Sequence, residues 1–196
     1  RDDISPRPFD EFLLKSSGMN MTISLNMDWH VDIFSVLIRH NISIVTHVPD
    51  AGHSPLLKLC DEAPDIELVT LTAEQDGVGV LCGAWAGGTK GVLLMQSSGV
   101  GNTVNALSLA VTCRIPLLTI VSMRGEWGEF VPWQVPMGQG TPGVLEAMGV
   151  RLFRVSEAAE VGETVDAAAS LAFNTRQSAA VLLSQKLIGA KQFSEG

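Results

Sequence analysis

Residues 71–107 read LTAEQDGVGVLCGAWAGGTKGVLLMQSSGVGNTVNAL, and this stretch decides the fold. Thr72 and Gln75 have the spacing of a capping box, which predicts a helix that begins here. Glu74 then lies in the first turn of that Gly/Ala-rich helix. Glycines at 87 and 88 favour a left-handed end to it.

The second half of the stretch predicts a strand followed by another helix. Residues 91–96 form a short apolar run that is typical of a buried strand. A glycine turn at 97–102 follows it and opens a helix from Asn102 to Cys113. Glu74 and this turn should therefore both lie at carboxyl ends of neighbouring strands, which is the edge where parallel sheets bind ligands.

The rest of the chain alternates between apolar strand patterns and helix patterns. Predicted strands cover 42–48, 66–71, 116–122, 151–155 and 179–184, and predicted helices follow Asp28, Ser54, Thr141-Pro142 and Ser156. Several strands are apolar throughout, as parallel strands covered on both faces must be. The sequence predicts a three-layer α/β/α domain with a six-stranded, mainly parallel sheet.

Two segments depart from this alternation. Residues 1–27 show no steady period, and we expect a flexible N-terminal arm or residue left from expression, with the domain covering 28–190. They lack the long apolar core of a signal peptide. Residues 123–140 also lack a period, and so long a loop is often functional. We expect its Trp127 and Trp133 to pack a subunit interface.

The composition narrows the class of protein. The chain has 196 residues, 46% of them apolar, which fits one globular domain with a sizeable core. The net charge of -8 and the lack of a Lys/Arg cluster argue against nucleic acid, and no apolar run is long enough for a membrane span. Cys60, Cys82 and Cys113 are widely spaced, which predicts reduced thiols in a cytoplasmic protein.

Common catalytic motifs are absent or incomplete in the sequence. The dinucleotide fingerprint that starts at Gly99 has Val104 in place of its third glycine, and neither a P-loop nor a Gly-x-Ser-x-Gly elbow is present. The histidines have no metal-ligand spacing. His30 and His40 are interpreted as structural or solvated, whereas His53 follows the first strand and is a candidate functional residue.

An ordered set of motifs gives the chain a family resemblance. The set is Thr72-Ala73-Glu74, then Met95-Gln96-Ser97-Ser98-Gly99-Val100-Gly101-Asn102, then Arg124-Gly125-Glu126, supported by Val48-Pro49-Asp50 and Leu56-Leu57-Lys58. It resembles the pyrimidine-binding domain of thiamine-diphosphate enzymes, most closely that of sulfopyruvate decarboxylase alpha subunits, with phosphonopyruvate decarboxylases next. The resemblance covers about residues 28–188.

The resemblance implies a decarboxylase subunit that works with thiamine diphosphate and Mg²⁺. A beta subunit would supply a Gly-Asp-Gly motif, which this sequence lacks, and would hold the diphosphate and the metal. The expected reaction converts 3-sulfopyruvate to sulfoacetaldehyde and CO₂ in a cytoplasmic hetero-oligomer built on dimers. Alternatives are a decarboxylase of phosphonopyruvate or another 2-oxo acid, or a non-catalytic pyrimidine-binding module.

The resemblance also assigns roles to residues. Glu74 would hydrogen-bond a ring nitrogen of the aminopyrimidine, which helps to remove the thiazolium C2 proton; an ordinary first-turn acid is the alternative. The expected cofactor-binding residues are Val48, Pro49, Glu74, Ser98, Gly99 and Asn102. The expected substrate-binding residues are Asp50, His53, Gln96 and Arg124, with Glu74 and His53 as catalytic residues. Arg124 would bind the anionic tail, or else form a loop salt bridge with Glu126 or Glu129.

Overall fold

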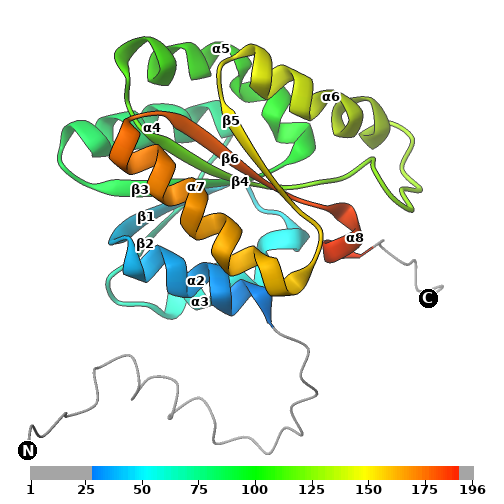
Figure 1. Cartoon of the computed structure of the whole chain (residues 1–196), viewed down its shortest axis with the longest axis horizontal. Coiled ribbons are helices and arrows are strands. Elements are labelled where there is room, and N and C mark those ends of the chain that lie inside the picture. The colour runs from blue at the N-terminus through cyan, green and yellow to red at the C-terminus, as the bar shows by residue number, and fades with distance from the viewer. Residues whose placement is uncertain (1–27, 190–196) are drawn as a thin grey trace, which may run out of the picture.

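The computed structural model describes residues 28–189, so the prediction of an N-terminal arm at 1–27 lies outside the described residues. Strands and helices alternate along the chain (Figure 1). The strands are β1 (Ile42–His47), β2 (Glu67–Thr70), β3 (Lys90–Gln96), β4 (Leu117–Ser122), β5 (Arg151–Val155) and β6 (Ser178–Leu183). The helices are α2 (Trp29–Arg39), α3 (Ser54–Glu62), α4 (Glu74–Ala86), α5 (Ser97–Cys113), α6 (Gln134–Ala147), α7 (Val161–Thr175) and α8 (Gln185–Ile188), with short 3₁₀ turns at Ala51–His53 and Ala158–Glu160.

The six strands form one sheet in the order β2-β1-β3-β4-β6-β5. Every neighbouring pair is parallel, which confirms the predicted sheet. Each strand must therefore reach the next through a crossover, and every one of these crossovers contains a helix. All carboxyl ends meet at one edge of the sheet as a result.

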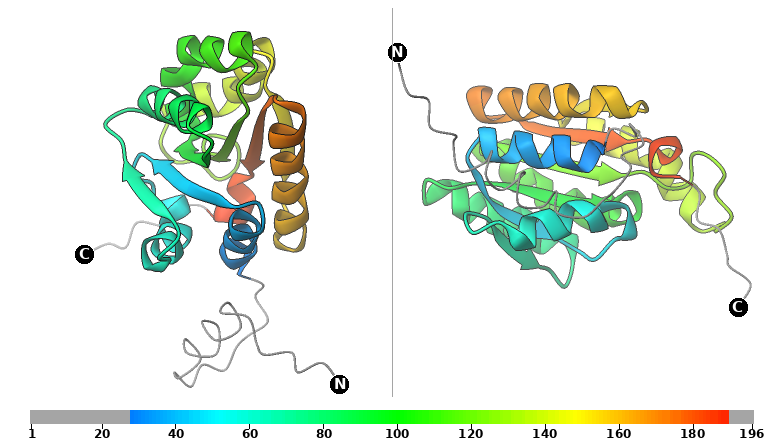
Figure 2. Two further views of the ribbon diagram at one scale, coloured as in Figure 1. Left: turned by 90° about the vertical axis from the view of Figure 1, so that its left-hand side faces the viewer. Right: turned by 90° about the horizontal axis from the view of Figure 1, so that it is seen from below.

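Two apolar cores flank the sheet and make the predicted three layers (Figure 2, left view). In β3, Val92 and Leu94 face the core under α2, α3 and α7, whereas Leu93 and Met95 face the core under α4, α5 and α6. Both sets of side chains are fully buried. This is why the strand is apolar without alternation.

Two predicted helix starts were wrong on either side of β3. The N-cap of α4 is Ala73, which has extended backbone and no side-chain cap, so Thr72 does not form the predicted capping box. The stretch 97–102 is not a turn, because α5 begins at Ser97. Glycine inside a helix costs roughly 0.5–1 kcal/mol relative to alanine. Packing overrides this preference at Gly99, as the site geometry shows below.

The helix predicted at Thr141-Pro142 also begins earlier, at Gln134, so Pro142 lies inside α6. A β-carbon on Gly138 would overlap the Arg124 carbonyl, so this part of α6 packs directly on the backbone of the preceding loop. Thr141 Oγ1 bonds both Met137 O at 2.7 Å and Ser97 O at 3.1 Å. These contacts outweigh the tendency of proline to start a helix. Similarly, α7 begins at Val161 after a 3₁₀ turn, not at Ser156.

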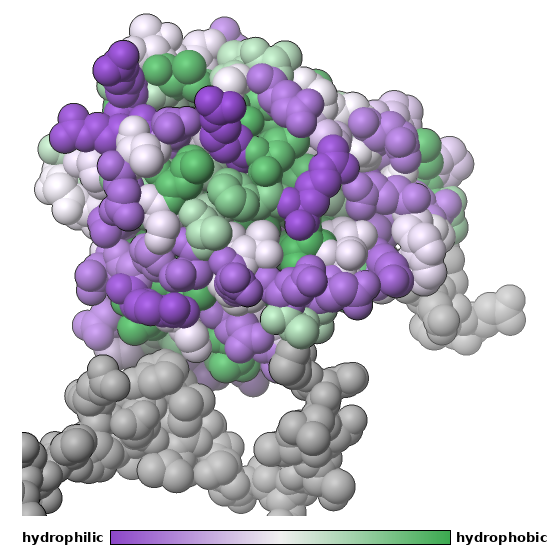
Figure 3. Space-filling model, in the orientation of Figure 1, coloured by the Kyte–Doolittle hydropathy of each residue, from purple (hydrophilic) through white to green (hydrophobic). Residues whose placement is uncertain are grey.

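The surface gives two further observations. Edge strand β5 carries exposed Arg151 and Arg154, and charged residues on an edge strand discourage pairing with other chains. In the orientation of Figure 1, the surface has a hydrophobic area in its middle that is surrounded by hydrophilic side chains (Figure 3). Among residues 28–189, none of the helices has the length and apolar character needed to cross a membrane.

Candidate active site

The carboxyl edge of the sheet gathers most of the polar residues that the sequence singled out. Strands β1, β3 and β4 are neighbours and end at His47, Gln96 and Ser122. Asp50 therefore lies beside Gln96 and the start of α5, although it is far from both in sequence. Glu74 and the segment 97–102 do meet, because Asn102 Nδ2 donates to Glu74 Oε2 at 2.8 Å. The prediction that they follow neighbouring strands was wrong, because β1 lies between β2 and β3.

Glu74 is a buried carboxylate held at the start of two helices. It is the first residue of α4 and is 8% exposed. A β-carbon on Gly99 would overlap its carboxyl group, so the carboxylate fills the space that this glycine leaves in the first turn of α5. The positive ends of both helix dipoles favour a negative charge here. Within residues 28–189, Glu74 Oε1 accepts no hydrogen bond.

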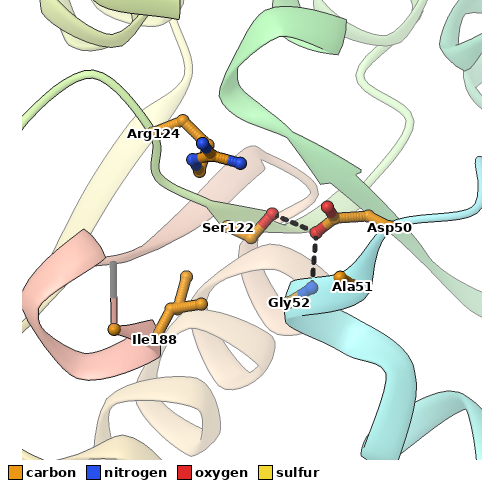
Figure 4. A pocket seen from close by; sticks show the side chains of 7 residues that line it. Asp50, Ala51, Gly52, Ser122, Arg124 and Ile188 are labelled. Atoms are coloured by element: carbon orange, nitrogen blue, oxygen red, sulfur yellow. Dashed lines mark hydrogen bonds between the residues drawn. The ribbon is translucent and has the colours of Figure 1, made fainter. Parts of the chain in front are cut away.

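Asp50 is the centre of a second polar group at the end of β1. Its carboxylate accepts hydrogen bonds from Ser122 Oγ at 2.6 Å, Gln96 Nε2 at 2.9 Å and Gly52 N at 3.2 Å. Figure 4 shows the Ser122 and Gly52 bonds converging on one carboxylate oxygen. Three donors fix the orientation of the carboxylate.

Gln96 extends this group toward α5 and α6. Its Oε1 accepts from Ser98 Oγ at 2.8 Å and from Gln134 Nε2 at 3.0 Å. Sequence reasoning missed Ser122 and Gln134. Ser122 could have been found, because it is a polar residue that ends an apolar strand at the ligand-binding edge. Gln134 had no comparable signal in a segment without periodicity.

Arg124 forms an ion pair with Glu129, the alternative that the sequence left open. Its Nε and Nη2 donate to the two oxygens of Glu129, each at 2.7 Å. Both side chains are buried, 8% and 3% exposed. These bonds, chiefly those from Arg124, lower the pKa of Glu129 to about 2. Because Glu129 keeps its charge, the positive charge of Arg124 is balanced within the loop.

Gln185 fastens this loop to the C-terminal end of the sheet. It is buried, its Oε1 accepts from the backbone N–H groups of Glu126 and Trp127, and its Nε2 donates to Glu129 at 2.9 Å. The sequence gave no sign of this role, because Gln185 follows the last strand in a short helix that was not predicted. The loop that follows β4 is thus held by its own Arg124–Glu129 ion pair and by Gln185.

A cavity of about 160 Å³ opens between these groups (Figure 4). It is lined by Asp50, Ala51, Gly52, Ser122, Arg124, Ile188 and Gly189. Asp50 and Ser122 supply a carboxylate and a hydroxyl, and Ile188 supplies an apolar wall. The arrangement suits a small polar molecule whose reacting group needs hydrogen bonds and proton transfer.

His53 lies beneath this edge and does not line the cavity. It is 1% exposed, its Nε2 lies 3.3 Å from Met95 O, and its Nδ1 is buried without a hydrogen-bond partner among residues 28–189. Burial lowers its pKa, so the ring stays neutral. The predicted direct role in substrate binding and catalysis would require His53 to become accessible.

The remaining predicted residues lie at the surface of the edge. Val48 is half-buried, whereas Pro49, Ser98 and Asn102 are exposed. Trp127 and Trp133 are 54% and 77% exposed. Within the described part of the chain, His, Cys, Asp and Glu form no group of three that could hold a metal ion.

Comparisons with known proteins agree with this geometry. Residues 27–129 match the family "Thiamine pyrophosphate enzyme, N-terminal TPP binding domain". The chain is 36% identical over 152 residues to sulfopyruvate decarboxylase subunit alpha of Methanococcus maripaludis, covering 77% of this chain and 91% of that protein. It is 37% identical over 160 residues to the same-named subunit of Methanothermobacter thermautotrophicus, covering 81% and 97%. Phosphonopyruvate decarboxylase of Streptomyces viridochromogenes is 35% identical over 99 residues, covering 50% of this chain and 25% of that protein.

Proposed function

Because the chain belongs to the thiamine pyrophosphate enzymes, whose N-terminal TPP binding domain it matches, we propose that it is the alpha subunit of a 2-oxo acid decarboxylase. The first-choice substrate is 3-sulfopyruvate, which would yield sulfoacetaldehyde and CO₂. The observation that supports this most strongly is the buried Glu74 carboxylate in the space beside Gly99, together with relatives named sulfopyruvate decarboxylase subunit alpha.

The residues around Glu74 fit the aminopyrimidine of thiamine diphosphate. Glu74 Oε1 would share a proton with a ring nitrogen, while Asn102 Nδ2 donates to the other oxygen. The exposed Pro49, Ser98 and half-buried Val48 lie at the same edge and would line the ring. When bound, thiamine diphosphate supplies an electron sink for the departure of CO₂.

The residues around Asp50 would orient the substrate and handle its protons. Loss of CO₂ requires a proton to be delivered to the product, and Ser122 and Gln96 both donate to Asp50. Fixed donors hold the Asp50 carboxylate in one orientation, in which it would position the substrate for proton delivery. Gln96, through Gln134, also ties this group to α6. His53 would keep the edge in place from below.

A partner subunit completes the proposal. The words "subunit alpha" in the names of the relatives support a second subunit, which would hold Mg²⁺ and the diphosphate. The exposed Trp127 and Trp133 are candidates for the interface. A cytoplasmic location belongs to the same proposal, since the three cysteines are free thiols.

The test is co-expression with a candidate beta subunit, followed by assays of 3-sulfopyruvate, phosphonopyruvate and pyruvate. We expect CO₂ release by the complex in the presence of thiamine diphosphate and Mg²⁺, fastest with 3-sulfopyruvate, and negligible turnover by this chain alone. Robust turnover by the isolated chain would refute the need for a partner. A complex that binds the cofactor without turning over any 2-oxo acid would favour a non-catalytic pyrimidine-binding module. Phosphonopyruvate is the second choice of substrate because of the relative from Streptomyces. If phosphonopyruvate is turned over faster than 3-sulfopyruvate, it would replace 3-sulfopyruvate as the proposed substrate.

A further inference from the structure

A second cavity lies at the opposite edge of the sheet, where the strands begin. It measures about 370 Å³ and lies between the ends of α5 and α7 and the starts of β5 and β6. Its lining residues are Ala110, Val111, Arg114, Gly149, Thr175, Arg176, Gln177 and Ser178. None of them belongs to the candidate active site.

The rim of this cavity is positively charged in a chain whose net charge is -8. Arg114 and Arg176 are exposed and form no ion pair with any residue between 28 and 189. A third guanidinium is adjacent, because Arg151 Nε donates to Gln177 Oε1 at 3.2 Å. Three arginines that form no ion pair among the described residues therefore lie at or beside this cavity, and their positive charges attract anions.

These arginines are not needed as helix caps. Arg114 and Arg176 follow the C-terminal ends of α5 and α7, where free carbonyl groups would favour a cation. A backbone N–H group already satisfies one carbonyl at each end, since Ile115 N donates to Ala110 O at 2.9 Å and Gln177 N to Ala172 O at 3.2 Å. Both arginines have left-handed backbone, with φ of 52° and 54°, where glycine or asparagine is less strained. Capping hydrogen bonds therefore do not require arginine at these positions.

Ser178 provides a hydroxyl at the floor of the cavity. It is 4% exposed, and its Oγ is buried without a hydrogen-bond partner in the described part of the chain. A buried hydroxyl usually has a partner, and leaving one unmade costs about 1–3 kcal/mol. An acceptor bound in this cavity would supply the missing partner once the Ser178 side chain turns toward it.

We propose that this cavity binds a small anion that carries a tetrahedral oxyanion group, phosphate or sulfonate. The guanidinium groups of Arg114 and Arg176 bind its oxygens, and the Ser178 side chain turns to donate its hydroxyl hydrogen to it. Guanidinium suits this ligand because its planar fork matches pairs of oxygens. The cavity lies at the edge away from Glu74 and Asp50, so this proposal does not rest on the proposed decarboxylation.

The test is a titration of the full chain with inorganic phosphate at constant ionic strength, followed through the backbone amide NMR signals of Gln177 and Ser178. We expect saturable shifts, and binding weakened about tenfold in Arg114→Gln and in Arg176→Gln, as the loss of one charged hydrogen bond predicts. Arg154→Gln is the matched control, since Arg154 is an exposed arginine outside the cavity. Shifts that do not saturate, or equal affinity in all three variants, would overturn the proposal.

A fourth variant separates binding from folding. Ser178→Ala removes the hydroxyl that lacks a partner. We expect weaker phosphate binding and a melting temperature, without phosphate, equal to or above that of the wild type. A lower melting temperature with unchanged phosphate affinity would instead assign the hydroxyl to the fold and contradict its role in the cavity.

Discussion

At the scale of single residues, Glu74 is a buried carboxylate that is proposed to interact with a bound cofactor. The carboxylate lies at the N-terminal ends of two helices, and Asn102 Nδ2 donates to one of its oxygens. These contacts hold the side chain in one orientation. Such a carboxylate is suited to share a proton with a bound ring.

The corresponding prediction is that Glu74→Gln preserves the fold and removes the acid. Turnover of the complex, and C2 hydrogen exchange of the bound cofactor measured by NMR, should slow by roughly 100-fold or more. The melting temperature should change little, because glutamine can keep the bond to Asn102. Asp76→Asn is the control, an exposed carboxylate in the same turn. Wild-type exchange in Glu74→Gln would remove Glu74 from the proposed chemistry.

At the scale of elements, α5 contains two glycines with different surroundings. A β-carbon on Gly99 would overlap the Glu74 carboxyl group, whereas one on Gly101 would make ordinary contacts of 3.6 Å with Met137. Substitution by alanine should therefore impair the site at position 99 and stabilise the helix at position 101.

Gly99→Ala should displace Glu74 and abolish most turnover. Gly101→Ala should raise the free energy of unfolding by about 0.5–1 kcal/mol, since alanine is the better helix former. Denaturant unfolding and the decarboxylase assay measure the two effects. Equal stability and activity in both variants would mean that Gly99 is not required by Glu74.

The loop from Met123 to Trp133 gives a prediction about substrate charge, which rests on the proposed function. Arg124→Ala should raise KM for 3-sulfopyruvate far more than for pyruvate. The difference should correspond to about 1.5–3 kcal/mol of binding free energy if one charged hydrogen bond is lost. Arg124→Lys should recover only part of this loss, because a point charge replaces a fork. Equal increases for both substrates would leave Arg124 only its observed ion pair with Glu129.

The elements also show what sequence could and could not predict. Apolar runs such as 91–96 identified the strands, because a strand covered on both faces has no other composition. Gly99 pointed to a turn and Pro142 to the start of a helix, yet helices pass through both positions. The helices continue through these positions because of tertiary contacts, and the close packing of a glycine against a distant segment cannot be predicted from local sequence preference. Glu74 was predicted from its place in the first turn of a helix and from the family resemblance, and Asp50 and Gln96 from the resemblance alone. The partners Ser122, Gln134 and Gln185 depended on contacts between distant segments.

At the scale of the whole molecule, stability should depend on pH in two ranges. Burial lowers the pKa of His53 and of His47 from 6.5, so the unfolded chain binds protons first as pH falls. Their contribution is complete above pH 6.5 and is lost below it. Glu129 behaves similarly at lower pH, with its pKa lowered from 4.5 to about 2. Its contribution is present above pH 4.5 and is lost as pH falls from 4.5 toward 2.

Denaturant unfolding across pH 2–7 measures both ranges. Glu129→Gln should flatten the dependence between pH 4.5 and 2 and should lower stability at neutral pH, because Arg124 would be buried without its counter-charge. His53→Asn should reduce the loss that begins below pH 6.5 and leave the lower range unchanged. An unchanged profile in Glu129→Gln would contradict the shifted pKa.

The strand order has a consequence for synthesis on the ribosome. In the sheet, β6 lies between β4 and β5, although it is made after both of them. Until β6 emerges, β5 has no strand to pair with, and the edge of β4 stays open, a state prone to aggregation. The arrival of β6 closes the sheet, and Gln185 follows directly to fasten the Arg124–Glu129 loop. A nascent chain that stops before β6 should therefore depend on chaperones, and its candidate active site matures last.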